Sequence, residues 1–133
     1  MGKDAKPGKV TEASFRRIAL GMKDAVEGAH MGHPDFRVGG RIFSTIHHDR
    51  AHGMVKLTPE QQQAFLREHP GTFAPESGAW GRAGCTRVTF ESVDEETLGE
   101  ALTLAWQNTA RASTAKASKP SSRRKREPRS SQA

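Results

Sequence analysis

The stretch from Gly32 to His47 reads GHPDFRVGGRIFSTIH and predicts the hairpin around which the rest of the chain is organised. Two runs rich in β-branched and aromatic residues, 36–38 and 41–47, flank the pair Gly39-Gly40. Glycine tolerates the positive φ angles that both central positions of a two-residue hairpin turn require. The stretch is therefore expected to form two antiparallel strands joined by a tight turn.

Alternation along these strands predicts how the hairpin divides its side chains between two faces, because successive side chains of a strand point to opposite sides. The apolar face is expected to hold Phe36, Val38, Ile42, Ser44 and Ile46. The opposite, outer face is expected to be basic with one aromatic ring, and to hold Arg37, Arg41, Phe43, Thr45 and His47.

The segment before the hairpin is expected to be an amphipathic helix. Apolar residues recur at three- and four-residue intervals from Val10 to Val26, and Thr11 is a suitable N-cap. Gly28 is expected to end the helix, because glycine readily takes the left-handed conformation found at helix C-termini. Pro34 disfavours helix in the residue before it, so the chain is expected to enter the hairpin in an extended conformation.

Two further strands are predicted downstream, at 54–57 and 85–91, where apolar and polar residues alternate. Alternation places Lys56 and Arg87 on the outer face, which Lys56 is expected to share with Arg41.

Helices and short connections complete the pattern. Residues 58–67 begin with TPEQ, in which a threonine N-cap precedes proline at the first helical position and glutamine at the third. Residues 72–75 are expected to be briefly extended, and 76–81 to form a glycine-rich loop. A closing helix is expected from Asp94 to about Ala110, with acidic residues in its first turn and an apolar stripe.

This element order predicts an α+β fold, a two-layer sandwich in which helices pack on one face of an antiparallel sheet. Residues 1–9 are expected to be a flexible N-terminus, 10–111 one domain, and 112–133 a disordered basic tail without apolar periodicity. No internal repeat is visible.

The basic charge of the chain belongs to its ends. The formal net charge is +6, but residues 10–115 carry eleven Lys and Arg against thirteen Asp and Glu. Residues 116–133 carry seven Lys and Arg against one acid. The high pI therefore says little about what the folded domain binds, whereas the tail favours non-specific contact with a phosphate polymer through counterion release.

Membrane, secretory and disulfide signals are lacking in the sequence. No apolar run of about 18 residues exists to cross a bilayer, and the first residues lack the apolar segment of a secretory signal. Cys85 is the only cysteine, so no intramolecular disulfide can form, and it is interpreted as a small strand residue. The protein is expected to be cytoplasmic.

Several motifs occur in an order that resembles the MmcQ/YjbR family. They are the run GHPDFRVGGRIF at 32–43, KLTPE at 56–60, the turn Trp80-Gly81-Arg82 and the acidic start of the closing helix at 94–96. The resemblance covers about residues 10–110, and its matched positions are His33, Pro34, Phe36, Lys56, Trp80 and Gly81. It implies a fold similar to frataxin-like proteins and type III secretion chaperones, with hairpins likened to a double wing, in a family generally labelled DNA-binding.

Nucleic-acid contacts are predicted where cations gather with an aromatic ring, since such a surface holds phosphates and stacks a base. The candidates on the domain and in the tail are Arg37, Arg41, Phe43, Lys56, Arg82, Arg87, Arg123, Arg124, Lys125 and Arg126. The alternative interpretation is an ordinary solvated face of an antiparallel sheet.

The histidines suggest two other sites. His33, Asp35 and Trp80 are candidates to line a pocket near the hairpin base, although the interpretation that His33 before Pro34 fixes a turn through a backbone hydrogen bond is favoured. Imidazoles at 47, 48 and 52 suit Zn²⁺ or Ni²⁺, but adjacent strand residues point to opposite faces and no supporting ligand motif is present, so no metal is predicted. No cofactor or catalytic motif is recognised, and an enzyme is not predicted.

The sequence thus favours a non-enzymatic DNA-binding protein, with largely non-specific contacts through wing hairpins, the basic sheet face and the tail. The alternative is a protein-interaction module that receives a partner segment on the open sheet face, with Phe43 as anchor. The partner, any base preference and the oligomeric state are not indicated by the sequence.

Overall fold

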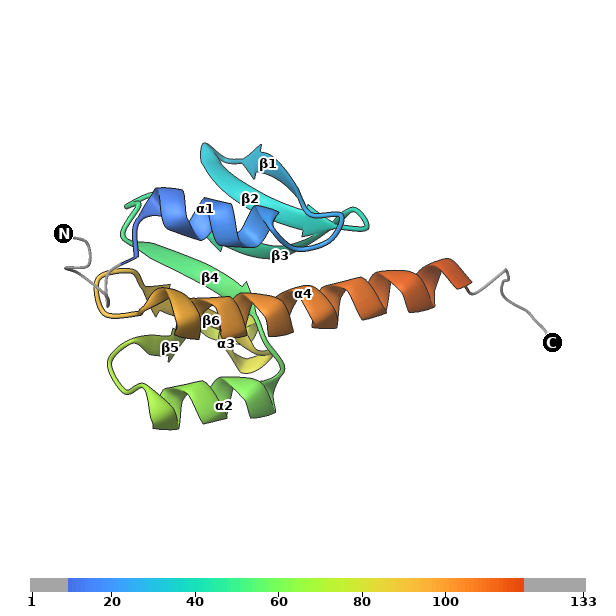
Figure 1. Cartoon of the computed structure of the whole chain (residues 1–133). Coiled ribbons are helices and arrows are strands. Elements are labelled where there is room, and N and C mark those ends of the chain that lie inside the picture. Colours follow the sequence, from blue (N-terminus) through green and yellow to red (C-terminus); the bar gives the residue numbers. More distant parts are fainter. Residues whose placement is uncertain (1–9, 119–133) are drawn as a thin grey trace.

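The computed structural model describes residues 10–118, with side chains described through Ala112. Its elements, drawn in Figure 1, are α1 (Glu12–Leu20), β1 (Val26–His30), β2 (His33–Val38), β3 (Arg41–Ile46), β4 (His52–Lys56), α2 (Pro59–Glu68), β5 (Phe73–Pro75), α3 (Gly78–Arg82), β6 (Cys85–Thr89) and α4 (Glu95–Ser118). The strands form one sheet in the order β1-β2-β3-β4-β6-β5, and every neighbouring pair is antiparallel. The predicted α+β class is confirmed.

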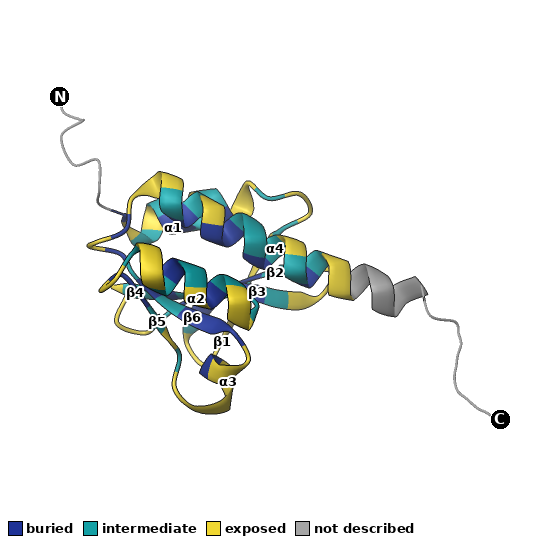
Figure 2. Cartoon of the chain, turned by 90° about the horizontal axis from the view of Figure 1, so that it is seen from below, coloured by how far each residue is buried: buried dark blue, intermediate teal, exposed yellow. Residues whose placement is uncertain are grey.

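The sheet has one covered face and one open face. Figure 2 shows α1, α2 and α4 on one side of the sheet and the short helix α3 on the other. The covered face buries the core, in which Phe15 of α1 and Leu98 and Leu102 of α4 pack on Phe36 and Val88 of the sheet. The other side, called the open face below, carries only the short helix α3 among the described residues.

The β2–β3 hairpin forms as predicted. Gly39 and Gly40 have φ angles of 61° and 81°, which are the positive values that a two-residue turn of this kind requires. This turn sets which residues of the two strands meet at the tip, where Val38 pairs with Arg41.

A bulge in this hairpin overturns part of the predicted face assignment. Phe36 pairs with Ser44 but Arg37 pairs with Ile42, so β3 has an extra residue, Phe43, at this point. Phe43 is fully buried in the core and not on the outer face. Ile42 moves to the open face opposite Arg37, because directly opposed residues share a face.

Arg41 is displaced by the same bulge. It pairs with Val38, whose side chain belongs to the core, so Arg41 lies on the helical side of the hairpin tip. The expectation that Arg41 shares a face with Lys56 is therefore wrong. Thr45 and His47, which follow the bulge, lie on the open face as predicted, where both line its cavity.

The N-terminal helix is shorter than predicted. Thr11 caps α1 in a capping box with Ser14, but the helix ends at Leu20, and Asp24 turns the chain with a φ of 62°. The residues expected to complete the helix form β1 instead, with Val26 57% exposed at the sheet edge. The expected helix end at Gly28 is wrong, because that glycine lies inside a strand.

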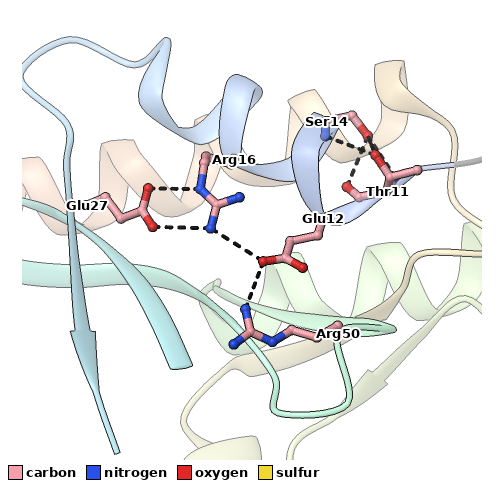
Figure 3. Close-up of polar contacts among 6 residues, drawn as sticks. All are labelled: Thr11, Glu12, Ser14, Arg16, Glu27 and Arg50. Carbon is pink, nitrogen blue, oxygen red and sulfur yellow. Dashed lines mark hydrogen bonds and ion pairs between the residues drawn. The ribbon is translucent and has the colours of Figure 1, made fainter. Parts of the chain in front are cut away.

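Ion pairs fasten α1 to the sheet, as Figure 3 shows. Arg16 donates to both carboxylate oxygens of Glu27 in β1, at 2.9 and 3.2 Å. Glu12 accepts from Arg16 at 3.4 Å and from Arg50, in the loop before β4, at 2.8 Å. These cations are therefore neutralised on the helical side of the molecule.

The predicted start of α2 is confirmed, with Thr58 as N-cap, Pro59 first and Gln61 completing a capping box. Buried Gln62 donates to the carbonyl oxygens of Gly81 and Cys85, which ties α2 to α3 and β6. The 76–81 segment, expected to be a loop, contains helix α3 from Gly78 onward.

Helix α4 begins as predicted, where the Asp94 carboxylate accepts from the backbone N–H of Thr97 at 2.7 Å. It extends to Ser118, past the expected end near Ala110 and into the segment expected to be disordered from Ala112. Within residues 10–118, no helix is both long and apolar enough to cross a membrane.

Candidate functional site

The open face is hollowed into a cavity of about 340 Å³, called the Trp80 cavity below. Its floor is formed by side chains of β3, β4 and β6 and of the residue after β3, and its two walls come from opposite ends of the sheet order. The β1–β2 end contributes His30 and His33, and the segment carrying α3 contributes Glu76, Ser77 and Trp80. The floor comprises Ile42, Thr45, His47, Met54, Lys56 and Cys85.

An adjoining depression, called the Arg87 depression below, continues the open face toward β5. It measures about 580 Å³ and includes Arg87, Ala74 and Phe73. His47 lines both the cavity and this depression, so the two are contiguous.

Lys56 and Arg87 are the two cations of this surface without an acidic partner. Lys56 pairs with Cys85 across β4 and β6, and Arg87 follows two residues later on β6, so the two cations are diagonal neighbours on one face. Such neighbours have Cα atoms about 7–8 Å apart. Within the described residues, neither side chain makes a hydrogen bond or an ion pair.

Arg37, another predicted contact, is occupied by a carboxylate. It donates through Nε to Asp35 Oδ1 at 2.7 Å and through Nη2 to Oδ2 at 3.0 Å. Asp35 is fully buried. The hydrogen bonds from Arg37, and to a smaller extent the contact with His30, lower the pKa of its carboxyl group. A Cβ at Gly28, opposite Asp35, would lie 2.9 Å from Asp35 Oδ1, so glycine there leaves room for the pair.

His47 and Glu76 form a second ionic contact, at the boundary between the cavity and the depression. His47 Nε2 lies 2.7 Å from Glu76 Oε2. The hydrogen bond to Glu76 raises the pKa of His47, and burial opposes this effect. The pair therefore carries no net charge when His47 is protonated and one negative charge when it is not.

The remaining histidines are arranged in stacks and turns. His33 packs between His30 and His48, with ring centroids 4.6 and 4.5 Å away, and burial lowers its pKa. His52 lies 2.7 Å from Asp49 through Nδ1. The rings of His47 and His52 lie edge to face with centroids 6.4 Å apart, whereas His48 packs on His33. No group of three potential metal ligands occurs within the described residues.

The predicted pocket residues separate in the structure. His33 and Trp80 line the cavity, and Trp80 is 69% exposed. Asp35 does not line it, because it lies buried beneath Arg37 and His30. Glu76, Met54 and Ile42 join the site without having been predicted for it.

The other predicted nucleic-acid residues lie elsewhere. Arg41 is on the helical side of the hairpin tip, Phe43 is in the core, and Arg82 borders a different depression next to Pro59 of α2. The tail residues Arg123, Arg124, Lys125 and Arg126 lie outside the described residues.

Steric crowding explains why glycine follows Trp80 in the sequence. A Cβ at Gly81 would lie 1.7 Å from the carbonyl oxygen of Glu76, so only glycine lets α3 pack so closely on the preceding turn. Gly81 therefore fixes the position of Glu76 relative to α3, the helix that carries Trp80 and forms one wall of the cavity.

Comparisons with known proteins agree with this fold. The YjbR family model matches residues 20–108. The crystal structure of the Deinococcus radiodurans protein DR2400, which carries a DUF419 domain, is similar with a TM-score of 0.60 and 22% sequence identity, over 86% of this chain and 83% of that one. No curated protein matches significantly. Because the family model spans most of the chain, this protein belongs to the YjbR family.

Proposed function

We propose that this protein is a non-enzymatic DNA-binding protein whose folded domain contacts DNA through the open face. The observation that carries the proposal is the pair Lys56 and Arg87, two unpaired cations close together on a concave surface. Such cations hold phosphates without reading sequence. The basic segment that follows Ser118 would add non-specific affinity.

Four arginines elsewhere on the domain are already paired with carboxylates. Arg16 and Arg50 are bound to acids on the helical side, and Arg17 donates to Glu95 at 2.8 Å. Arg37 is bound to Asp35. A phosphate approaching these residues would compete with an existing carboxylate, whereas Lys56 and Arg87 are available without that cost.

The cysteine of the Trp80 cavity is poorly suited to nucleophilic catalysis, which supports the non-enzymatic part of the proposal. Burial raises the pKa of the Cys85 thiol despite the nearby Lys56, which disfavours the thiolate that a cysteine nucleophile needs.

The test is charge removal at the proposed contact, compared with equal removal elsewhere. The double variant Lys56→Gln, Arg87→Gln is compared with Lys23→Gln, Arg67→Gln, two exposed cations on the helical side, in the full chain, binding DNA at several salt concentrations. Each phosphate contact contributes about 0.9 to the slope of log affinity against log salt. Losing two contacts should flatten the slope by about 1.8 and, near 0.1 M salt, weaken binding by about 60-fold.

The control pair should change affinity by less than about threefold, because surface charges away from phosphate act only through the screened overall field. Equal losses in the two double variants would contradict the proposal, since binding would then depend on total charge and not on the open face.

A protein-interaction module is the second candidate, favoured by exposed apolar side chains. Val26, Met31 and Trp80 are 57%, 82% and 69% exposed. The predicted anchor Phe43 is buried, so Trp80 takes that role in this candidate. Unchanged DNA affinity in the Lys56 and Arg87 variant would favour this function over DNA binding.

A further inference from the structure

We infer that the open face binds a single strand of nucleic acid, with one unstacked base in the Trp80 cavity against the indole of Trp80. This inference rests on the proposed function and names the form of nucleic acid that the same surface takes. It is carried by the size of the cavity, by the chemistry of its walls and by the positions of Lys56 and Arg87.

The size of the cavity suits one small group such as a nucleobase. The β1–β2 end of the sheet and α3 line the cavity, and Figure 2 shows α3 on the side of the sheet opposite α1, α2 and α4. Its volume of about 340 Å³ is at the lower end of the range for small-molecule pockets, about 300–1,000 Å³. In a duplex the bases are stacked and paired, so flipping one into a pocket costs a few kcal/mol, whereas a single strand pays least.

The walls provide stacking surfaces and hydrogen-bonding groups for a base. Trp80 is 69% exposed although it borders the cavity, and Ile42, Met54 and Cys85 make the floor beside it apolar. Stacking of a base on an exposed aromatic side chain accepts any base, because every base has a π face. Thr45 and His33 add groups that can donate or accept at the base edge.

The two free cations give the backbone a path on either side of His47. Lys56 lies in the cavity and Arg87 in the adjoining depression, and His47 borders both. A strand that places a base in the cavity can therefore set one flanking phosphate against Lys56 and the next against Arg87. A peptide would leave these cations unmatched unless it were acidic.

The first experiment compares three DNA ligands of equal length with the full chain: a single strand, its duplex, and the single strand with its central bases replaced by abasic sites. The unmodified single strand should bind most tightly. Trp80→Ala should weaken its binding by about 5–150-fold, from about 1–3 kcal/mol per stacked base. The same substitution should leave duplex and abasic-strand affinities within about twofold.

The second experiment reads the stacking directly through fluorescence. The chain has two tryptophans, and Trp106 donates to the carbonyl oxygen of Lys23 on the helical side. In a Trp106→Phe variant, emission from Trp80 should be quenched by the single strand in proportion to binding and unchanged by the abasic strand. Thermal unfolding confirms that each variant is folded.

The outcomes separate this inference from the proposed function. Tighter binding to duplex, or equal effects of Trp80→Ala on all three ligands, would overturn the single-strand inference while the Lys56 and Arg87 test still supported DNA binding. If the Lys56→Gln, Arg87→Gln variant bound every ligand as tightly as the natural protein does, both the single-strand inference and the proposed DNA binding by the open face would be overturned.

Discussion

Gly81→Ala should displace α3, which carries Trp80, and destabilise the domain. The added Cβ would lie 1.7 Å from the carbonyl oxygen of Glu76 and 2.7 Å from the carbonyl carbon. Backbone atoms cannot rotate away as a side chain would, so α3 must move by more than about 1 Å relative to Glu76. Overpacking of this kind costs about 1–3 kcal/mol.

The assay is thermal unfolding, with Gly99→Ala as the matched control. At about 4–8 °C per kcal/mol for a domain of this size, Gly81→Ala should lower Tm by about 4–24 °C. Gly99 lies in α4 with nothing within 4 Å of an added Cβ, so Gly99→Ala should stabilise the helix by about 0.5–1 kcal/mol. An unchanged Tm for Gly81→Ala would refute the close packing of α3 on Glu76.

Two further substitutions test the corrected sheet. Phe43→Ala should destabilise the domain by about 3–5 kcal/mol, because a buried ring leaves a cavity; a denaturant midpoint like that of the natural protein would mean that Phe43 lies on the open face after all. Asp35→Asn should cost about 2 kcal/mol at neutral pH by weakening hydrogen bonds to charged Arg37. Because the pKa of Asp35 is lowered on folding, its stabilisation is full above the unfolded pKa and is lost as pH falls through the folded value. The difference between the two proteins should therefore shrink below about pH 4 in unfolding curves, and a constant difference would contradict the ionic role of Asp35.

Local signals predicted the elements whose conformation is decided within a few residues. The paired glycines at 39 and 40 specified the hairpin turn, and the TPEQ motif at 58–61 specified the start of α2. Lys56 and Arg87 were placed correctly because neither β4 nor β6 contains a bulge, so alternation holds along both strands.

The errors arose where tertiary contacts override local pattern. The bulge at Phe43 is favoured by burying a large ring, which alternation alone does not reveal. Val26 continues the helical spacing of the preceding segment, yet it belongs to β1, which pairs with β2. The contact of His47 with Glu76 joins residues distant in sequence and left no signal. The ion pair between Asp35 and Arg37 does have a signal in the sequence, because residues two apart on a strand share a face.

Mapping the nucleic-acid contact on the labelled full chain by NMR tests the open face most directly. Titration with a single-stranded oligonucleotide should shift the indole N–H of Trp80 and the backbone amides around Lys56 and Arg87, with saturation at a common affinity. Amides of α2 around Arg67, on the helical side, should not move. Shifts confined to residues 119–133, with Trp80, Lys56 and Arg87 unchanged, would contradict DNA binding by the folded domain.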